Sequence, residues 1–315
     1  MRQHSIAGDL TGRVVLLANR LNITYWAIRI ASRVARRLPL QLSYTIATAG
    51  ADLAFAGWRG IRVRTTENMG WVVGPNADPG SAAELARGAL RNYGKYIVEF
   101  LRFPWMAHEE IARAVELRGV EHLHAAMAEG KGVIAIGFHI GNIDLGAAVL
   151  AQLGYPVNVV VDRFDPPELD ALIQRQREAK GLKLIPLDEA PRRSLRALRR
   201  NEVLALLIDR PSPLDGVVVR FFGGEIAIPG GAAVLALRTG APVVPCCVFR
   251  GSGGRFIAEV APPVLPKRLQ TGDSQRDIQA ITQRLVETLE AWVRRHPDQW
   301  YPFRRMWLSS ARLSS

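Results

Sequence analysis

One histidine and one aspartate stand close together in an otherwise apolar stretch, AIGFHIGNIDLGAAVLAQLG, at residues 135–154. His139 precedes Asp144 by five residues, and a glycine stands two residues away on each side of the histidine. An imidazole whose Nδ1–H is held by a carboxylate keeps Nε2 free as a base, which suits removal of a proton from an attacking hydroxyl. The alternatives are a core histidine with a helix-capping aspartate, and a metal site, for which two ligands are too few.

The stretch that carries the pair has the pattern of a strand, a turn and a helix. Residues 132–138 form a short apolar run typical of a buried strand, and residues 142–154 have the pattern of a helix that ends at a glycine. If such a unit folds residue i+5 back toward residue i, the carboxylate of Asp144 accepts the Nδ1 proton of His139. The pair is then expected at the carboxyl end of a strand, the edge where open α/β sheets bind ligands.

Strand-like and helix-like segments alternate along the rest of the chain. We place this α/β domain at residues 76–315 and a separate N-terminal helical arm at residues 1–75. The alternation predicts a mainly parallel twisted sheet covered by helices on both faces. Residues 108–119 fit either a short strand and turn or a helix. Further strands are expected at residues 156–162, 183–187, 203–209, 241–250 and 255–264.

The composition indicates a globular protein with a strongly basic surface. The 315 residues are 48% hydrophobic and carry a formal net charge of +12. Such a charge favours anionic partners, namely nucleic acid, anionic lipid or an acidic carrier protein, and is also found on plain soluble basic surfaces. We expect no nucleic-acid partner because no helix-turn-helix or RNA-recognition signature is found. The absence of G-x-G-x-x-G and of a P-loop disfavours a nucleotide-dependent enzyme.

The two cysteines, Cys246 and Cys247, are adjacent within an apolar run. Neighbouring cysteines rarely form an unstrained disulfide, so we interpret them as reduced strand residues in a cytosolic setting. There is no C-x-x-C motif and no Cys/His cluster, which argues against a structural zinc site.

The N-terminal region, residues 13–60, is apolar but interrupted by arginines. Residues 1–70 contain ten arginines and three acidic residues. The longest uncharged run, residues 38–51, has 14 residues, fewer than the roughly 18–20 needed to span a bilayer. An apolar helical face edged with arginine suits a helix in the membrane interface, or one packed on the protein's own core. The face is formed by Leu17, Leu21, Tyr25 and Ile28, with Arg13, Arg20 and Arg37 nearby.

Several blocks, taken in order over residues 80–308, resemble one family. His139-Ile-Gly-Asn-Ile-Asp144 resembles the His-x4-Asp signature of the glycerolipid and lysophospholipid acyltransferases. The chain is similar to the branch that holds the lipid A secondary acyltransferases and the mycobacterial phosphatidylinositol mannoside acyltransferases. The other matching blocks are VVVDRFDPPELDALIQRQRE, LLIDRPSPLDGVVVRFFGGEIAIPGGAAVLALRTGAPVVPCCVFR and HPDQWYPFRRMW.

The resemblance implies a reaction. A fatty acyl group passes from a thioester of coenzyme A or acyl carrier protein, a co-substrate, to a hydroxyl of a glycolipid or phospholipid, and neither a cofactor nor a metal is needed. His139 would deprotonate that hydroxyl, Asp144 would orient His139, and Glu225 would neighbour the histidine. Direct attack without an acyl-enzyme fits the lack of a G-x-S-x-G motif.

Substrate-binding roles follow from the same blocks. Arg163 follows an expected strand, and is either a phosphate or oxyanion contact or a surface salt-bridge partner of Asp162 or Asp165. Gly230 and Gly231 open an expected helix whose N-terminal amides suit an oxyanion or a phosphate, with a tight turn as the alternative.

Two further pairs of residues are candidates for binding the donor or the acceptor. Arg175 and Arg177 belong to the second block, with exposed helix charges as the alternative. Asp209 and Arg210 end an expected strand at the same sheet edge, and Asp209 alternatively holds a turn.

From the basic N-terminal arm we expect a peripheral protein on the cytoplasmic face of the cell membrane, with the arm held at anionic lipid. The final Asp of the motif is closer to the mannoside branch, whereas PDQW…RR near the end is closer to the lipid A branch, so the acceptor stays open. Two alternatives remain: a thioester or ester hydrolase of the same fold, and a non-catalytic basic lipid-binding protein.

Overall fold

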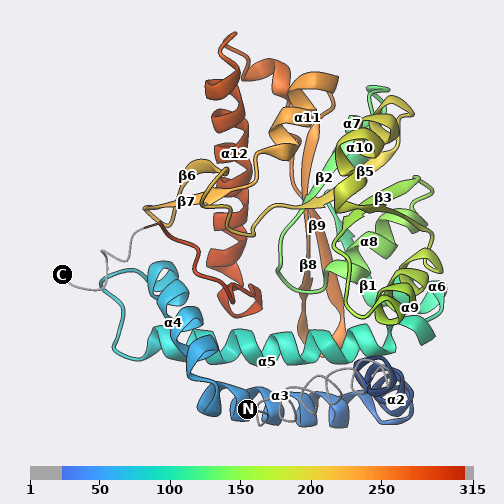
Figure 1. Ribbon diagram of the computed structural model, residues 1–315, viewed down its shortest axis with the longest axis vertical. Coiled ribbons are helices and arrows are strands. Elements are labelled where there is room, and N and C mark those ends of the chain that lie inside the picture. The colour runs from blue at the N-terminus through green and yellow to red at the C-terminus, as the bar shows by residue number, and fades with distance from the viewer. Residues whose placement is uncertain (1–22, 309–315) are drawn as a thin grey trace, which may run out of the picture.

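The computed structural model describes residues 23–308, and its centre is a seven-stranded sheet (Figure 1). The spatial order is β1-β9-β8-β2-β5-β3-β4, and each neighbouring pair is parallel except β8 with β9. The predicted mainly parallel α/β fold is confirmed. The strands are β1 (Val115–Arg118), β2 (Val133–Gly137), β3 (Val157–Val161), β4 (Leu182–Pro186), β5 (Val203–Leu207), β8 (Val243–Arg250) and β9 (Phe256–Val260).

Helices cover both faces of the sheet, as the side chains of β2 demonstrate. Val133 and Ala135 pack in a cluster with α7 and α8, whereas Ile134 and Ile136 pack in a cluster with α11 and α12. Successive side chains of a strand point to opposite faces, so a strand covered on both sides is apolar throughout. The helices of this domain are α6 (His108–Ala114), α7 (Val120–Met127), α8 (Ile143–Gln152), α9 (Pro167–Glu178), α10 (Ala190–Arg199), α11 (Gly231–Thr239) and α12 (Ser274–Arg295).

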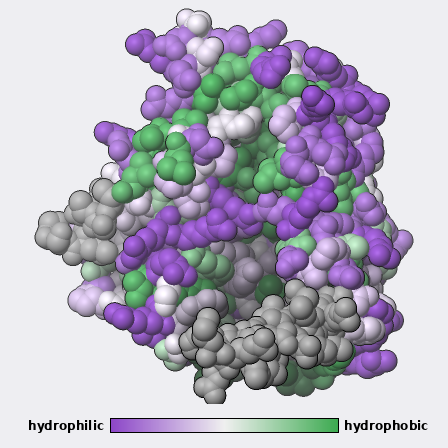
Figure 2. Space-filling view, in the orientation of Figure 1, coloured by the Kyte–Doolittle hydropathy of each residue, from purple (hydrophilic) through white to green (hydrophobic). Residues whose placement is uncertain are grey.

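A hollow opens on one face of this domain. Figure 2 shows hydrophobic side chains gathered there, between α11 and the α10 side of the molecule, and residues of both helices line one large cavity. The hollow reaches the carboxyl ends of the central strands, where Gly137 ends β2 and Leu207 ends β5.

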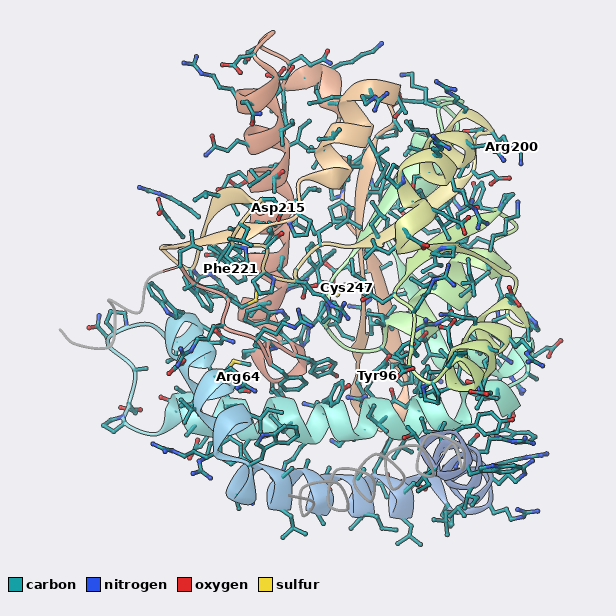
Figure 3. The ribbon with its side chains drawn as sticks, viewed as in Figure 1. Arg64, Tyr96, Arg200, Asp215, Phe221 and Cys247 are labelled. Carbon is teal, nitrogen blue, oxygen red and sulfur yellow. The ribbon has the colours of Figure 1, made fainter. Side chains whose placement is uncertain are left out.

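Two strands outside the main sheet form an antiparallel hairpin, β6 (Val217–Phe221) and β7 (Gly224–Ile228), which packs on α12. Phe222 and Gly223 connect them with φ values of 48° and 75°. Two consecutive positive φ values match the twist of tight hairpins. Figure 3 shows Phe221 at the end of this hairpin, away from the main sheet.

Two local features concern the start of α12 and the segment at residues 108–119. Asp273 caps α12 by accepting from the backbone N–H groups of Gln275 and Arg276. Residues 108–119 contain both of the alternatives weighed for them, since α6 is followed directly by β1.

The N-terminal arm consists of helices that pack mainly on α5. In Figure 1, α5 lies between the sheet and the arm helices α2 and α3, whereas α4 lies on the same side of α5 as the sheet. Tyr25 and Ile28 of the predicted apolar face are partly buried, and Ile28 lines the cavity. Leu17, Leu21, Arg13 and Arg20 lie outside the described residues. The arm helices are α2 (Ile23–Arg37), α3 (Leu40–Gly57) and α4 (Arg59–Val73), and α5 spans Ser81–Arg102. Within residues 23–308, none of the helices is both long and apolar enough to cross a membrane.

Candidate active site

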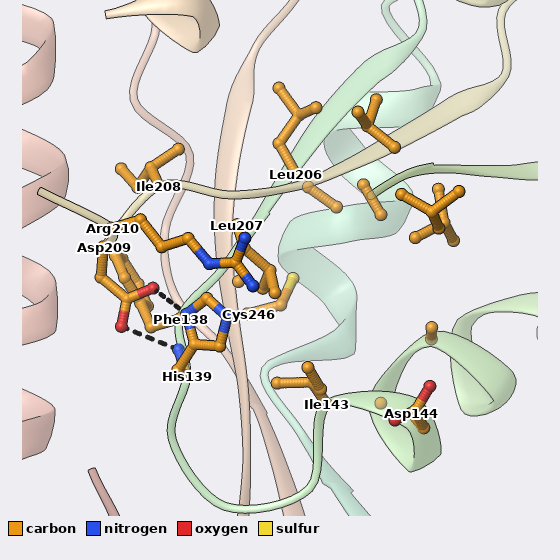
Figure 4. Close-up of a pocket in the computed structure, with 18 of the residues that line it drawn as sticks. Phe138, His139, Ile143, Asp144, Leu206, Leu207, Ile208, Asp209, Arg210 and Cys246 are labelled. Atoms are coloured by element: carbon orange, nitrogen blue, oxygen red, sulfur yellow. Dashed lines mark hydrogen bonds and ion pairs between the residues drawn. The ribbon is translucent and has the colours of Figure 1, made fainter. Parts of the chain in front are cut away.

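His139 lies beside Asp209 because β2 and β5 are neighbours in the sheet. Their register pairs Gly137 with Leu207, so both polar residues follow two positions after a paired strand end. The Nδ1 atom of His139 is 2.7 Å from Oδ1 of Asp209, and the backbone N–H of His139 donates to Oδ2 over 2.8 Å (Figure 4). One carboxylate therefore fixes both the backbone and the ring of the histidine.

The surroundings of Asp209 keep its carboxylate ionised. Burial alone would raise the pKa of Asp209, but the charge of His139 and hydrogen bonds from His139 and Trp300 outweigh burial and hold it below the ordinary value. The indole Nε1 of Trp300 donates to Oδ2 over 3.2 Å. An ionised carboxylate only accepts hydrogen bonds, so in the neutral imidazole Nδ1 carries the ring proton and Nε2 is free as a base.

Asp144 lies in the first turn of α8, as predicted, but bonds to other groups. Its Oδ1 accepts from Nε of Arg177 over 2.9 Å, and its Oδ2 accepts from the hydroxyl of Tyr96 over 2.7 Å. Burial first, and then the charge of Asp144, raise the pKa of Tyr96 well above its ordinary value, so its hydroxyl stays protonated and donates. The predicted contact between Asp144 and Nδ1 of His139 is wrong, and Asp209 takes its place.

The loop between His139 and α8 explains why the two residues separate. Gly141 has a φ of +61°, and a Cβ there would lie 1.7 Å from the carbonyl oxygen of Val248. The N–H groups of Gly141 and Asn142 donate to the carbonyls of Gln299 and Val248, each over 2.9 Å. The loop is therefore held against β8 and the C-terminal segment, and Figure 4 shows Asp144 away from the histidine ring.

Both carboxylate pairs border a single cavity of about 1090 Å³. Most of its lining is apolar and comes from the central strands, α8, α10 and α11. A cavity of this size and lining is typical of a site for a largely apolar ligand. Among residues 23–308, no three or more His, Cys, Asp or Glu side chains come together as metal ligands.

Two predicted arginines occupy different positions relative to the cavity. Arg163 is exposed and pairs with Asp188 over 3.3 Å, a partner not anticipated from the sequence, and it does not line the cavity. Arg210 lines the cavity and forms an ion pair with Asp162.

Among the remaining predicted binding residues, some line the cavity and others do not. Arg177 lines the cavity, whereas Arg175 is exposed on α9 and donates to a carbonyl of its own helix. Gly230 is the N-cap of α11, and a Cβ there would lie 2.6 Å from Cγ2 of Val217. Gly231 begins the helix and lines the cavity.

Glu225 is not placed beside His139. It is an exposed residue of β7, opposite Arg220 in the hairpin register, and it does not line the cavity. The hairpin lies outside the main sheet, so a residue there does not share the edge formed by β2 and β5. The expectation that Glu225 neighbours the histidine is wrong.

Sequence reasoning did not anticipate the roles of Tyr96 and Trp300. Tyr96 comes from α5, and Figure 3 shows it on the side of that helix that faces the sheet. Trp300 belongs to the family-like block HPDQWYPFRRMW, but the sequence did not indicate which residue it contacts. The contacts of Tyr96 with Asp144 and of Trp300 with Asp209 each join residues more than 40 positions apart. Short-range sequence patterns do not reveal such contacts.

Comparison with known proteins supports the resemblance. Residues 15–309 match the model of a family described as bacterial lipid A biosynthesis acyltransferase. A phosphatidylinositol mannoside acyltransferase of Mycolicibacterium smegmatis is 30% identical over 306 residues, 95% of each chain. One from Mycobacterium tuberculosis is 32% identical over 232 residues, 71% of each chain. A lipid A biosynthesis acyltransferase of Haemophilus influenzae is 25% identical over 194 residues, 61% of this chain and 58% of the relative.

Proposed function

The chain belongs to the bacterial lipid A biosynthesis acyltransferase family and is an acyltransferase, and on that premise we propose that His139 is its general base. The acyl donor is a fatty acyl thioester of coenzyme A or acyl carrier protein. The acceptor is a hydroxyl of a glycolipid or phospholipid, in line with the names of the relatives. The observation that carries the proposal is the His139–Asp209 pair at the edge of a large apolar cavity.

The steps of the proposed reaction follow from the protonation state of the His139–Asp209 pair. Nε2 of His139 takes the proton of the acceptor hydroxyl while ionised Asp209 holds the opposite nitrogen and stabilises the imidazolium that forms. The acceptor oxygen attacks the thioester carbonyl carbon, and a tetrahedral oxyanion forms. When it collapses, the carbon–sulfur bond breaks, the ester is released, and the imidazolium returns its proton to the departing thiolate.

Transfer without an acyl-enzyme is supported by the cysteine next to the site. Cys246 lines the cavity, but burial raises the pKa of its thiol to about 12. The thiolate is the nucleophilic form, so this thiol is unreactive near neutral pH. This argues against an acyl-enzyme on Cys246 and favours direct attack of the acceptor oxygen on the donor.

The basic groups around the cavity suit anionic parts of the substrates. Arg177, Arg210 and Arg238 line it, and guanidinium groups bind phosphates through paired hydrogen bonds. We assign them to phosphates of the donor or the acceptor. The first amides of α11, at Gly231, suit the thioester oxygen or the oxyanion.

The arm suits attachment to the surface of an anionic membrane. Its exposed large apolar side chains include Trp26 and Ile30 on α2 and Ile46 and Leu53 on α3, and Leu53 is 75% exposed. Arg33, Arg36 and Arg37 are exposed on α2. Apolar burial combined with arginine attraction is how interfacial helices bind. We place the protein peripherally on the cytoplasmic face, where acyl thioesters are made.

The deciding experiment is a transfer assay on the full chain. Labelled palmitoyl-coenzyme A or palmitoyl acyl carrier protein is incubated with vesicles that contain a phosphatidylinositol mannoside or an underacylated lipid A, and the products are resolved by mass. His139→Ala is compared with the wild type. His108→Ala is the matched control, because His108 is exposed on α6 and does not line the cavity.

The outcomes separate the alternatives. A new acylated lipid that disappears in His139→Ala and persists in His108→Ala supports the proposal, and its mass identifies the acceptor. Free fatty acid without an acylated lipid indicates a hydrolase. Full transfer by His139→Ala contradicts the role of His139. No turnover with either donor favours a binding protein.

A further inference from the structure

A buried ion pair is bonded to the loop that joins His139 to Asp144. Glu99 of α5 and Arg250 at the end of β8 have side chains that are only 6% and 9% exposed. The Nε and Nη2 atoms of Arg250 donate to Oε1 of Glu99 over 2.9 and 2.7 Å. Buried charge pairs are weak evidence for stability, so this pair is better explained by what it holds in place.

Glu99 holds the side chain of Asn142. Its Oε2 accepts from Nδ2 of Asn142 over 2.6 Å, and Asn142 is almost fully buried. The other end of the same amide, Oδ1, accepts from the backbone N–H of Leu145 and caps α8. Because the carboxylate accepts only, it fixes which end of the amide faces the helix. The start of α8, which carries Asp144, is thereby oriented.

The backbone of Arg250 fixes the other side of the loop through Gln299. Oε1 of Gln299 accepts from the N–H of Arg250 over 2.7 Å, and Nε2 of Gln299 donates to the carbonyl of Arg250 over 2.9 Å. The carbonyl of Gln299 accepts from the N–H of Gly141. Glu99 and Arg250 therefore determine both a side-chain contact and a backbone contact of the loop that follows His139.

The same carboxylate also reaches the arm. The hydroxyl of Tyr44, a buried residue of α3, donates to Oε1 of Glu99 over 2.7 Å. Glu99 therefore accepts hydrogen bonds from Tyr44 of the arm, Arg250 of the sheet and Asn142 of the active-site loop.

We propose that Glu99 is a positioning residue, which fixes the active-site loop through Asn142 and ties it to Arg250 and to Tyr44 of the arm. The proposal rests on the acyl transfer proposed for His139. Glu99 and Asn142 are given no chemical step, because neither lines the cavity. Their effect on catalysis passes through the position of the loop.

Exchanging the two side chains tests this contact. Glu99→Gln places an amide against an amide, with an NH₂ group facing another donor. Asn142→Asp places a carboxylate against a carboxylate and keeps an acceptor for the N–H of Leu145. The double variant exchanges the amide and the carboxylate, so one hydrogen bond returns with donor and acceptor reversed and the net charge is unchanged.

Each single change is expected to lower kcat about 10- to 100-fold, as for other residues that orient a reacting group. The KM for the acyl donor should stay within about 2-fold, because the cavity lining is intact. The double variant should recover to within about 5-fold of the wild type. A loss in the double variant equal to the product of the two single losses would overturn the proposal.

Asn142→Ser provides a second test that does not need the charged variants to fold. Serine caps a helix well but is too short to reach Glu99. A loss of kcat of about 10- to 100-fold in Asn142→Ser supports positioning through the link. Wild-type kcat in Asn142→Ser would contradict it, because the cap alone would then be sufficient.

A measurement that needs no turnover keeps the two proposals separable. The ring ¹⁵N resonances of His139 should shift in Glu99→Gln and in Asn142→Asp, and return toward wild-type positions in the double variant. If the wild type transfers no acyl group but the resonances return in this way, the proposed function fails and the positioning role stands. Unchanged resonances in both single variants would contradict the positioning role even in an active enzyme.

Discussion

Two buried aspartates at the same end of the sheet have different partners. Asp209 follows β5, and its side chain, 2% exposed, bonds to His139. Asp144 begins α8, and its side chain, 5% exposed, bonds to Arg177 and Tyr96. Burial and position along the edge are alike, so the partners decide what each carboxylate can do.

The two sites differ in whether the partner can exchange a proton near neutral pH. Imidazole gains and loses a proton in this range, whereas a guanidinium remains charged. The pair of Asp209 and His139 can therefore move a proton. The pair of Asp144 and Arg177 maintains a fixed arrangement at the cavity wall, and this leads us to assign catalysis to the first and positioning of substrate groups to the second.

Of the variants that test this comparison, Asp209→Asn is expected to have the largest effect on activity. It should lower kcat about 10³- to 10⁴-fold. An amide has one oxygen for two donors, the backbone N–H and Nδ1–H of His139. Its NH₂ group then favours the tautomer with the proton on Nε2, which removes the base. The measurement is single-turnover transfer, with circular dichroism as the check on folding. Activity within about 3-fold of the wild type would show that Asp209 does not set the tautomer.

The same variant should also change how stability depends on pH. The pKa of Asp209 is lower in the folded protein than the roughly 3.9 of an unfolded aspartate. The carboxylate therefore contributes stability that is fully present above the unfolded value and is lost as pH falls through the folded one. Denaturant titrations should show the difference in unfolding free energy between the wild type and Asp209→Asn decreasing below about pH 4. A difference that stays constant would contradict the lowered pKa.

The strands of the main sheet, apart from β1, were predictable from sequence, but the β6–β7 hairpin and the neighbours of each strand were not. Short apolar runs give β2 and β5, and the position after each run places His139 and Asp209 at the same edge. That the two are adjacent depends on β5 lying beside β2, a relation between segments about 65 residues apart. Sequence proximity favoured Asp144 instead, and that expectation failed because Gly141 and Val248 hold the loop elsewhere.

Asp144→Asn should have a smaller effect on activity and a clear effect on stability. It removes the charge opposite Arg177, whose side chain is 13% exposed, and loss of one partner of a buried pair is destabilising. We expect kcat/KM to fall about 10- to 100-fold. The pH–rate profile should keep the wild-type midpoint, because the His139–Asp209 contact is intact. A shifted midpoint would mean that Asp144 acts on the histidine after all.

Tyr96→Phe should have a smaller effect still. The change removes one hydrogen bond to Asp144 and leaves the ion pair with Arg177 in place. We expect a loss of about 1 kcal/mol in the free energy of unfolding. Activity should stay within about 10-fold of the wild type. A loss as large as that of Asp209→Asn would place Tyr96 in contact with the reacting groups. Thermal unfolding and steady-state kinetics on the same sample measure both quantities.

Glu225→Gln should have the smallest effect. It tests an acidic residue that lies outside both aspartate sites. The residue is exposed on β7 and does not line the cavity, so stability should change by less than about 0.5 kcal/mol. Transfer should proceed at about the wild-type rate, because the tautomer of His139 is already set by Asp209. A large loss of activity would require the β6–β7 hairpin to bring a second carboxylate to the histidine during turnover. In that case the histidine would have two acidic partners, and Asp209 alone would no longer explain the base.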